Sequence, residues 1–261
     1  MLTSGSIVLA GFVASLATGI ATGLGALPLF FVRRVSARLE DIFLGFAAGV
    51  MLAAAFFSLI IPALDVAEAR LASKSVAALL VTTALALGAG AMWFIHDHAP
   101  HEHMALGRDR PRGTKLRRIW LFVIAITLHN VPEGLAVGVG FGGGDTANGL
   151  KVATGIGLQN MPEGLAVAAS VAGLGYAHWK AILIALATGL VEPVAGVLGA
   201  AAVSLAEPVL PWGLGFAAGA MLFIVSHEII PETHRNGHQN EATLGFLVGL
   251  AVMMFLDVTL A

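Results

Sequence analysis

Long apolar stretches separated by short polar breaks run along the whole chain. A hydrocarbon core of about 30 Å needs about 20 apolar residues per helix. Cutting the chain at its polar and Gly/Pro-rich breaks gives eight such stretches, at residues 5–32, 42–63, 75–95, 118–141, 148–173, 179–204, 209–233 and 241–260. The pattern predicts an all-α polytopic membrane protein with eight transmembrane helices, which form a single transmembrane domain over residues 1–261.

Composition supports the same class and narrows the chemistry. Hydrophobic residues make up 57% of the chain and charged residues 11%, against about 25% charged in soluble domains, so there is too little charge to solvate a globular surface. The net charge of −2 offers no field for nucleic acid. The chain has no cysteine, so a metal site must use imidazole, carboxylate, amide or thioether ligands. No organic cofactor is expected.

Basic residues distinguish the two sides of the predicted bundle. Of the 14 Lys and Arg residues, three fall on the side of the N-terminus and eleven on the other, led by Arg33, Arg34, Arg38 and a cluster at 108–118. The positive-inside rule therefore places both termini outside the cytoplasm.

Two helices carry an internal repeat. Segments 44–52 and 214–222 differ at one position, and each is followed by an Ile-Pro pair, at 61–62 and 230–231. The predicted topology makes the two copies antiparallel, which is the inverted-repeat pattern of secondary transporters. Glycines spaced four apart on several helices allow close helix approach and suit a homodimer in the lipid bilayer.

A second repeat places polar residues in the middle of the membrane. Residues 129–134 read His-Asn-Val-Pro-Glu-Gly and residues 159–164 read Gln-Asn-Met-Pro-Glu-Gly. Burying each glutamate costs at least ~2.5–3.5 kcal/mol, so a compensating cation is expected. The alternatives are a proton relay and a structural hydrogen-bond network. With a third carboxylate on the sixth helix, the candidate divalent-metal ligands are His129, Asn130, Glu133, Gln159, Asn160, Glu163 and Glu192, a set able to hold two metals about 3.5–4 Å apart.

Further polar residues outline a transport path on either side of this layer. Some have a simpler interpretation: Asp41 as a helix N-terminal acid, Met51 as core packing, and Glu232 and His234 as an interfacial cap. Asp65, Glu68 and Asp257 would form a cation-attracting vestibule at the outer side. The candidate pathway residues are Asp41, Met51, Asp65, His227, Glu228, Glu232, His234 and Asp257.

The longest connector, residues 96–117, lies on the cytoplasmic side and is rich in histidine. It is either a solvated loop or a metal-holding segment, because closely spaced neutral imidazoles chelate borderline cations. Its candidate ligands are His96, His98, His101 and His103.

Over essentially its whole length the chain resembles the ZIP (Zrt/Irt-like) family of divalent-metal transporters, in its prokaryotic branch. The resemblance rests on the eight spans, the histidine-rich connector, the motifs at 129–134 and 159–164, and Glu192-Pro193. It implies a 3+2+3 helix arrangement with inverted repeats around the motif pair. It also implies the plasma (inner) membrane of a prokaryote as the location.

The resemblance also implies two metal subsites. The first falls on His129, Glu133, Gln159 and Glu163, and the second on Asn130, Glu133, Asn160, Glu163 and Glu192. Gln159 stands where many relatives carry a second His, and an amide is a weaker zinc ligand than imidazole.

The leading functional hypothesis is transport of divalent cations into the cytoplasm, with Zn²⁺ as the bound substrate and Cd²⁺, Fe²⁺ and Mn²⁺ as further candidates. The protein is then not an enzyme. The alternative from another class is an intramembrane metal-dependent hydrolase, with Glu133 or Glu163 as general base. A proton-driven exporter of something other than metal is a third hypothesis.

Overall fold

A computed structural model describes residues 3–31, 35–98 and 112–259. Within these ranges the chain is helical and has no strand. The elements are α1 (Ser4–Gly25), η1 (Leu27–Phe30), α2 (Ala37–Ala53), η2 (Ala54–Ile60), α3 (Ile61–Leu71), α4 (Lys74–His98), α5 (Arg112–Gly142), α6 (Thr146–Ala172), α7 (His178–Gly189), α8 (Glu192–Leu205), η3 (Glu207–Val209), α9 (Leu210–Ile224), η4 (Val225–Ile229), α10 (Ile230–Thr233) and α11 (Gln239–Thr259).

Several of these elements join end to end into membrane-length helices. Within the described residues, seven helices are long and apolar enough to cross a membrane. The helix α6 is not among the seven, although it is 27 residues long. It carries the polar residues of the second motif, which are buried against other helices instead of facing lipid. The prediction of an all-α polytopic membrane protein is confirmed.

The connector predicted at 96–117 is shorter in the structure. The helix α4 continues to His98, and α5 already begins at Arg112. Charged and imidazole side chains at these helix ends do not interrupt the backbone hydrogen bonds, so the polar composition marked the loop too wide. His101 and His103 lie outside the described residues.

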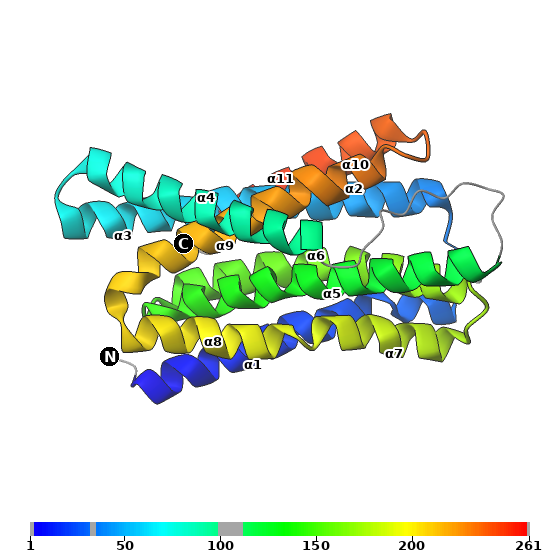
Figure 1. The fold of residues 1–261 in the computed structure, drawn as a ribbon, viewed down its shortest axis with the longest axis horizontal. Coiled ribbons are helices and arrows are strands. Elements are labelled where there is room, and N and C mark those ends of the chain that lie inside the picture. Colours follow the sequence, from blue (N-terminus) through cyan, green and yellow to red (C-terminus); the bar gives the residue numbers. More distant parts are fainter. Residues whose placement is uncertain (1–2, 32–34, 99–111, 260–261) are drawn as a thin grey trace.

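The helices run along one long axis, as Figure 1 shows. The N-terminus, the turn from α3 to α4 and the connection from α8 to α9 lie at one end, and the turns after α6 and α10 lie at the other. The helices α1, α7 and α8 form one side, α5 and α6 lie in the middle, and α2, α4, α9 and α11 form the other side. Direct contacts of α5 with both α8 and α9, and of α6 with both α1 and α2, tie the sides together.

Glycine allows the helices α2 and α11 to approach each other closely. A side chain at Gly45 would meet the backbone of Ala242 in α11, and one at Gly245 would meet the backbone of Ile42 in α2. Gly45 and Gly245 are therefore used for packing between helices of the same chain. The homodimer stays a prediction.

The inverted repeat is visible in the backbone. Each copy widens into a π-helical segment, η2 or η4, directly before its Ile-Pro pair. In η2 the N–H of Ile61 donates to the carbonyl of Phe56, and in η4 the N–H of Ile230 donates to that of Val225. Both bonds span five residues. The two copies thus share a local irregularity of the kind that often marks functional sites.

Candidate metal centre

The two motifs lie inside the continuous helices α5 and α6, and their prolines, Pro132 and Pro162, do not end either helix. Their polar side chains face the interior. The seven predicted ligands are at most 3% exposed: His129, Asn130, Glu133, Gln159, Asn160, Glu163 and Glu192. The structure thus brings all of them into the protein interior, as the helical spacing predicts.

One hydrogen bond joins the two motifs directly. The side-chain amide of Gln159 donates from Nε2 to Glu133 Oε1 at 2.6 Å. The i, i+4 spacing of each motif places this amide beside the glutamate of the other motif. Gln159 therefore both belongs to the predicted ligand set and orients Glu133.

The third carboxylate, that of Glu192, lies where one helix ends and the next begins. The span predicted over 179–204 separates into α7 and α8 around Leu190 and Val191, and Glu192 is the first residue of α8. Pro193 follows it, a residue well suited to the first turn because it has no N–H to satisfy. The positive end of the α8 dipole favours a carboxylate at this position.

Glu192 has partners from two other helices. Asn160 donates from Nδ2 to Glu192 Oε1 at 2.7 Å, and Thr18 of α1 donates from Oγ1 to Glu192 Oε2 at 2.5 Å. Asn160 Nδ2 also donates to the main-chain oxygen of Thr18 at 2.9 Å. Sequence reasoning missed Thr18. Its signal was the spacing of Ser15, Thr18 and Thr22 along one face of a glycine-rich helix.

The glycines that end the two motifs explain how α8 and α1 come so near. A Cβ at Gly134 would collide with the backbone of Glu192, and a Cβ at Gly164 would collide with the backbone of Thr22. The Pro-Glu-Gly sequence therefore supplies a carboxylate together with the close helix contact that encloses it.

Unpartnered polar atoms concentrate at this layer. Among the described residues, eight buried side-chain N and O atoms have no hydrogen-bond partner, and seven of them belong to the predicted ligands. They are His129 Nδ1, Asn130 Nδ2 and Oδ1, Glu133 Oε2, Gln159 Oε1, Asn160 Oδ1 and Glu163 Oε1. Buried polar groups normally have hydrogen-bond partners. The oxygen and nitrogen atoms of this layer are therefore of the kind that a bound cation and its water ligands would use.

The imidazole and carboxylate groups do not form a compact cluster by themselves. Within the described part of the chain, no three His, Asp or Glu side chains converge closely enough to hold a metal ion. Amides lie between the carboxylates, as the contacts of Gln159 with Glu133 and of Asn160 with Glu192 illustrate. Metal binding at this layer therefore requires side-chain rearrangement or the participation of the amides.

A second polar group continues from the first motif toward α4 and η4. Glu228 lies 2.6 Å from His129 Nε2 through one oxygen and 3.2 Å from His96 Nδ1 through the other. His96 Nε2 lies 3.2 Å from His227 Nε2. His96 thus belongs to the end of a transmembrane helix instead of a loop. Its neighbour His98 bonds the carbonyl of Phe94 in its own helix at 2.9 Å.

Asp41 is buried beside the connection from α10 to α11. Its carboxylate accepts from Asn236 Nδ2 at 3.0 Å and lies 2.8 Å from His238 Nδ1. His238 is a second residue that sequence reasoning missed. It lies outside the predicted spans, and no local motif marks it.

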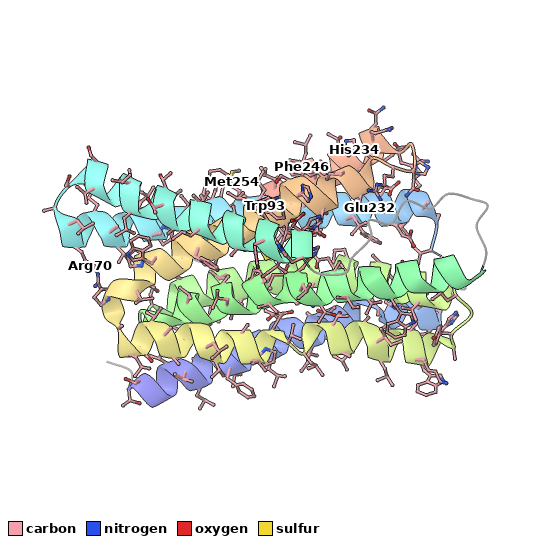
Figure 2. All side chains as sticks on the ribbon, in the orientation of Figure 1. Arg70, Trp93, Glu232, His234, Phe246 and Met254 are labelled. Carbon is pink, nitrogen blue, oxygen red and sulfur yellow. The ribbon has the colours of Figure 1, made fainter. Side chains whose placement is uncertain are left out.

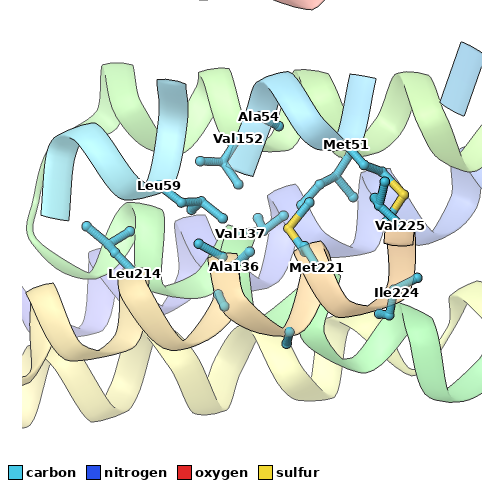
Figure 3. Packing of buried hydrophobic residues seen from close by; sticks show 14 of the residues in the cluster. Met51, Ala54, Leu59, Ala136, Val137, Val152, Leu214, Met221, Ile224 and Val225 are labelled. Carbon is cyan, nitrogen blue, oxygen red and sulfur yellow. The ribbon is translucent and has the colours of Figure 1, made fainter. Parts of the chain in front are cut away.

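Other pathway candidates have varied surroundings. At the opposite end Asp257 accepts from Ser58 Oγ at 2.7 Å. Met51 is fully buried in the apolar core that also contains Met221, as Figure 3 shows, so the described contacts give it a packing role.

The remaining candidates lie nearer the surface. Asp65 is exposed, and Glu68 pairs with Lys74 at 3.7 Å. Glu232 pairs with Arg235 at 2.9 Å, and His234 lies 2.8 Å from the carbonyl of Ile230. Figure 2 places Glu232 and His234 near the end of α10.

Together the fold and this layer define a helical membrane protein with a buried, ligand-rich centre. Comparison with known proteins identifies its family. The family model described as ZIP Zinc transporter matches residues 95–257. Zinc transporter GufA of Myxococcus xanthus is 46% identical over 251 residues, which cover 96% of this chain and 99% of GufA.

Two further relatives show the same relationship. Zinc transporter ZIPB of Bordetella bronchiseptica is 46% identical over 240 residues, covering 92% of this chain and 78% of ZIPB. Zinc transporter ZIP11 of Homo sapiens is 35% identical over 320 aligned positions, covering 92% of this chain and 94% of ZIP11. The chain belongs to the ZIP zinc transporter family, as the resemblance implied.

Proposed function

We propose that this protein carries divalent metal ions, Zn²⁺ foremost, across the membrane into the cytoplasm. The ions bind at the layer formed by α5, α6 and α8. One observation carries the proposal: seven of the eight unpartnered buried polar atoms among the described residues lie on the predicted ligands. Family membership and relatives named zinc transporters support the choice of cargo.

Two metal positions follow from the ligand set. Glu133 and Glu163 would bridge them, with His129 and Gln159 on one side and Asn130, Asn160 and Glu192 on the other. Several carboxylate oxygens in one layer are the usual means of holding two cations close together. The amide contacts of Gln159 and Asn160 would be exchanged for metal contacts as the ions arrive.

The polar groups beyond the layer outline the path. Ser58 and Asp257 lie toward the end that carries the termini, and Glu228, His96 and His227 lie on the opposite side of the first motif. The sequence predicts an excess of Lys and Arg on that side, which would make it the cytoplasmic side by the positive-inside rule. The bacterial relatives support the plasma membrane of a prokaryote as the location. Ions would thus pass from the carboxylates to a group richer in imidazole before release.

The ligand mix also bears on which metals are carried. Gln159 offers an amide oxygen where imidazole would bind zinc more tightly. Cd²⁺, Fe²⁺ and Mn²⁺ therefore join Zn²⁺ as proposed cargo. Moderate affinity suits transport, since an ion must leave as well as enter.

Uptake into proteoliposomes tests the proposal. Purified protein is reconstituted, and saturable uptake of Zn²⁺, Cd²⁺ and Mn²⁺ is compared between the wild type and Glu133→Gln. We expect wild-type uptake that the variant loses while its thermal unfolding is unchanged. Stoichiometric metal binding with no uptake by the wild type would instead favour the metal-dependent hydrolase. Uptake of no metal and binding of none would favour proton-driven export.

A further inference from the structure

The helix α1 makes hydrogen bonds to the predicted ligands through Thr18. Thr18 is 3% exposed and makes two contacts with predicted ligands. Its hydroxyl donates to Glu192 Oε2 at 2.5 Å, and its main-chain oxygen accepts from Asn160 Nδ2 at 2.9 Å. Because Asn160 also donates to Glu192 Oε1, the three residues form a closed triangle between α1, α6 and α8.

The hydroxyl of Thr18 has a choice of acceptors. It carries one proton, and both Glu192 Oε2 and the carbonyl of Ser15, at 3.0 Å, lie within reach. A hydrogen bond to a carboxylate is shorter and stronger than one to a neutral carbonyl. The Thr18 hydroxyl therefore donates its hydrogen bond to Glu192. The Ser15 carbonyl keeps the hydroxyl satisfied when the carboxylate moves or changes.

This arrangement holds both oxygens of the Glu192 carboxylate, one through Thr18 and the other through Asn160. Glu192 is the first residue of α8, directly after the two residues that separate α7 from α8. Groups that hydrogen-bond to metal-ligating side chains set their orientation, and removing such a group typically weakens metal binding. Thr18 is the residue of α1 placed to perform this role.

We infer that Thr18 is a positioning residue for the metal: through its hydroxyl it holds Glu192 in the orientation that completes the half of the site near α1. The inference rests on the proposed function, since it assumes that Glu192 contacts the transported ion. It assigns to α1 a part in ion binding that the two motifs do not reveal.

Three variants separate the hydroxyl from the shape of the side chain. Thr18→Val replaces the hydroxyl with a methyl group of similar size, and Thr18→Ser keeps the hydroxyl. Thr188→Val is the matched control, because Thr188 is equally buried and its hydroxyl donates to the carbonyl of Ala185 in its own helix at 2.7 Å. Equilibrium Zn²⁺ binding to purified protein and the KM and maximal rate of Zn²⁺ uptake are measured for each.

We expect Thr18→Val to weaken Zn²⁺ binding roughly 10–100-fold and to raise KM in parallel. Thr18→Ser should restore affinity to within about twofold of the wild type, since it keeps the donor, and Thr188→Val should match the wild type. Wild-type affinity in Thr18→Val overturns the inference. Equal losses in Thr18→Val and Thr18→Ser also overturn it, because they would assign the effect to packing.

A double-mutant cycle gives a readout that a purely structural role would not produce. If Thr18 acts through Glu192, then Thr18→Val should have little further effect on Zn²⁺ binding once Glu192→Gln is present. Independent, additive losses contradict the inference. Should Thr18→Val not fold, Thr18→Ala serves in the same cycle. If the wild type neither binds nor takes up metal, the proposed function itself is refuted. If the wild type is functional and Thr18→Val binds Zn²⁺ with the same affinity, only the role of Thr18 is refuted.

Discussion

His129 Nε2 lies 2.6 Å from Glu228 Oε2, while His129 Nδ1 is buried without a partner. In a neutral imidazole one nitrogen donates and the other carries a lone pair. In the neutral imidazole, the contact with Glu228 places the proton on Nε2 and leaves the lone pair of Nδ1 available to an ion at the proposed site. Imidazoles that bind metals commonly donate their second nitrogen to a carboxylate in this way.

Removing that carboxylate should weaken the site without removing a ligand of the central layer. We expect Glu228→Ala to lower Zn²⁺ affinity roughly 10–100-fold, because His129 loses the group that fixes its tautomer and ring orientation. Titration of purified protein with Zn²⁺ measures the change. The matched control is Glu241→Ala, whose carboxylate pairs with Arg38 near the surface. An affinity equal to that of the wild type in Glu228→Ala would contradict this assignment.

His96 and His98, both predicted to lie in the connector at 96–117, should respond differently to substitution. His96 contacts Glu228 and His227, whereas His98 bonds within its own helix and stacks on Phe94. We expect His96→Ala to lower the maximal rate of Zn²⁺ uptake several-fold, since an ion leaving the centre loses an imidazole on its path. His98→Ala should leave uptake unchanged. Wild-type uptake by His96→Ala would place His96 outside the path, and an equal loss in His98→Ala would contradict the difference predicted here.

The two carboxylates proposed to bridge the metal ions, Glu133 and Glu163, should be essential for uptake. Glu133→Gln and Glu163→Gln keep side-chain volume but remove the negative charge that offsets the cation in the membrane interior. We expect each to abolish Zn²⁺ uptake while the protein remains folded, as judged by thermal unfolding in detergent. Glu241→Gln is the control, because this carboxylate pairs with Arg38 at 3.0 Å near the surface. Normal uptake by either bridging variant would exclude its carboxylate from the path.

The close helix contact at the first motif should be sensitive to one methyl group. A Cβ at Gly134 collides with the backbone of Glu192, whereas a Cβ at Gly90 meets nothing within 4 Å. We expect Gly134→Ala to destabilise the fold by ~1–3 kcal/mol through overpacking. Gly90→Ala should be neutral or stabilise it by up to about 1 kcal/mol through helix propensity. Thermal unfolding of both variants measures the difference, and equal melting temperatures would contradict the described contact.

Replacing the amide of the second motif should change selectivity. Gln159→His introduces an imidazole beside Glu133, and imidazole favours Zn²⁺ over Mn²⁺ more strongly than an amide oxygen does. We expect tighter Zn²⁺ binding and a lower maximal rate of Zn²⁺ uptake, because release becomes slower. Competition between Zn²⁺ and Mn²⁺ uptake tests this expectation. An unchanged ratio would place Gln159 away from the ion.

The sequence predicted those parts of the site that depend on local spacing. His129 and Glu133 are one helical turn apart, so burying one face of α5 buries both. Thr18 and Glu192 are 174 residues apart, and only the packing of α1 against α8 brings them together. His96 was hidden for a different reason, because its polar neighbours suggested a loop while the helix continues to His98.

The bond between Ser58 and Asp257 spans 199 residues, from the second membrane helix to the last. Both side chains lie within membrane-length helices, where a polar group without a partner is costly. If helices insert in chain order, Ser58 enters the bilayer long before Asp257 is synthesised. The Ser58 hydroxyl therefore gains this partner only when α11 has packed beside η2.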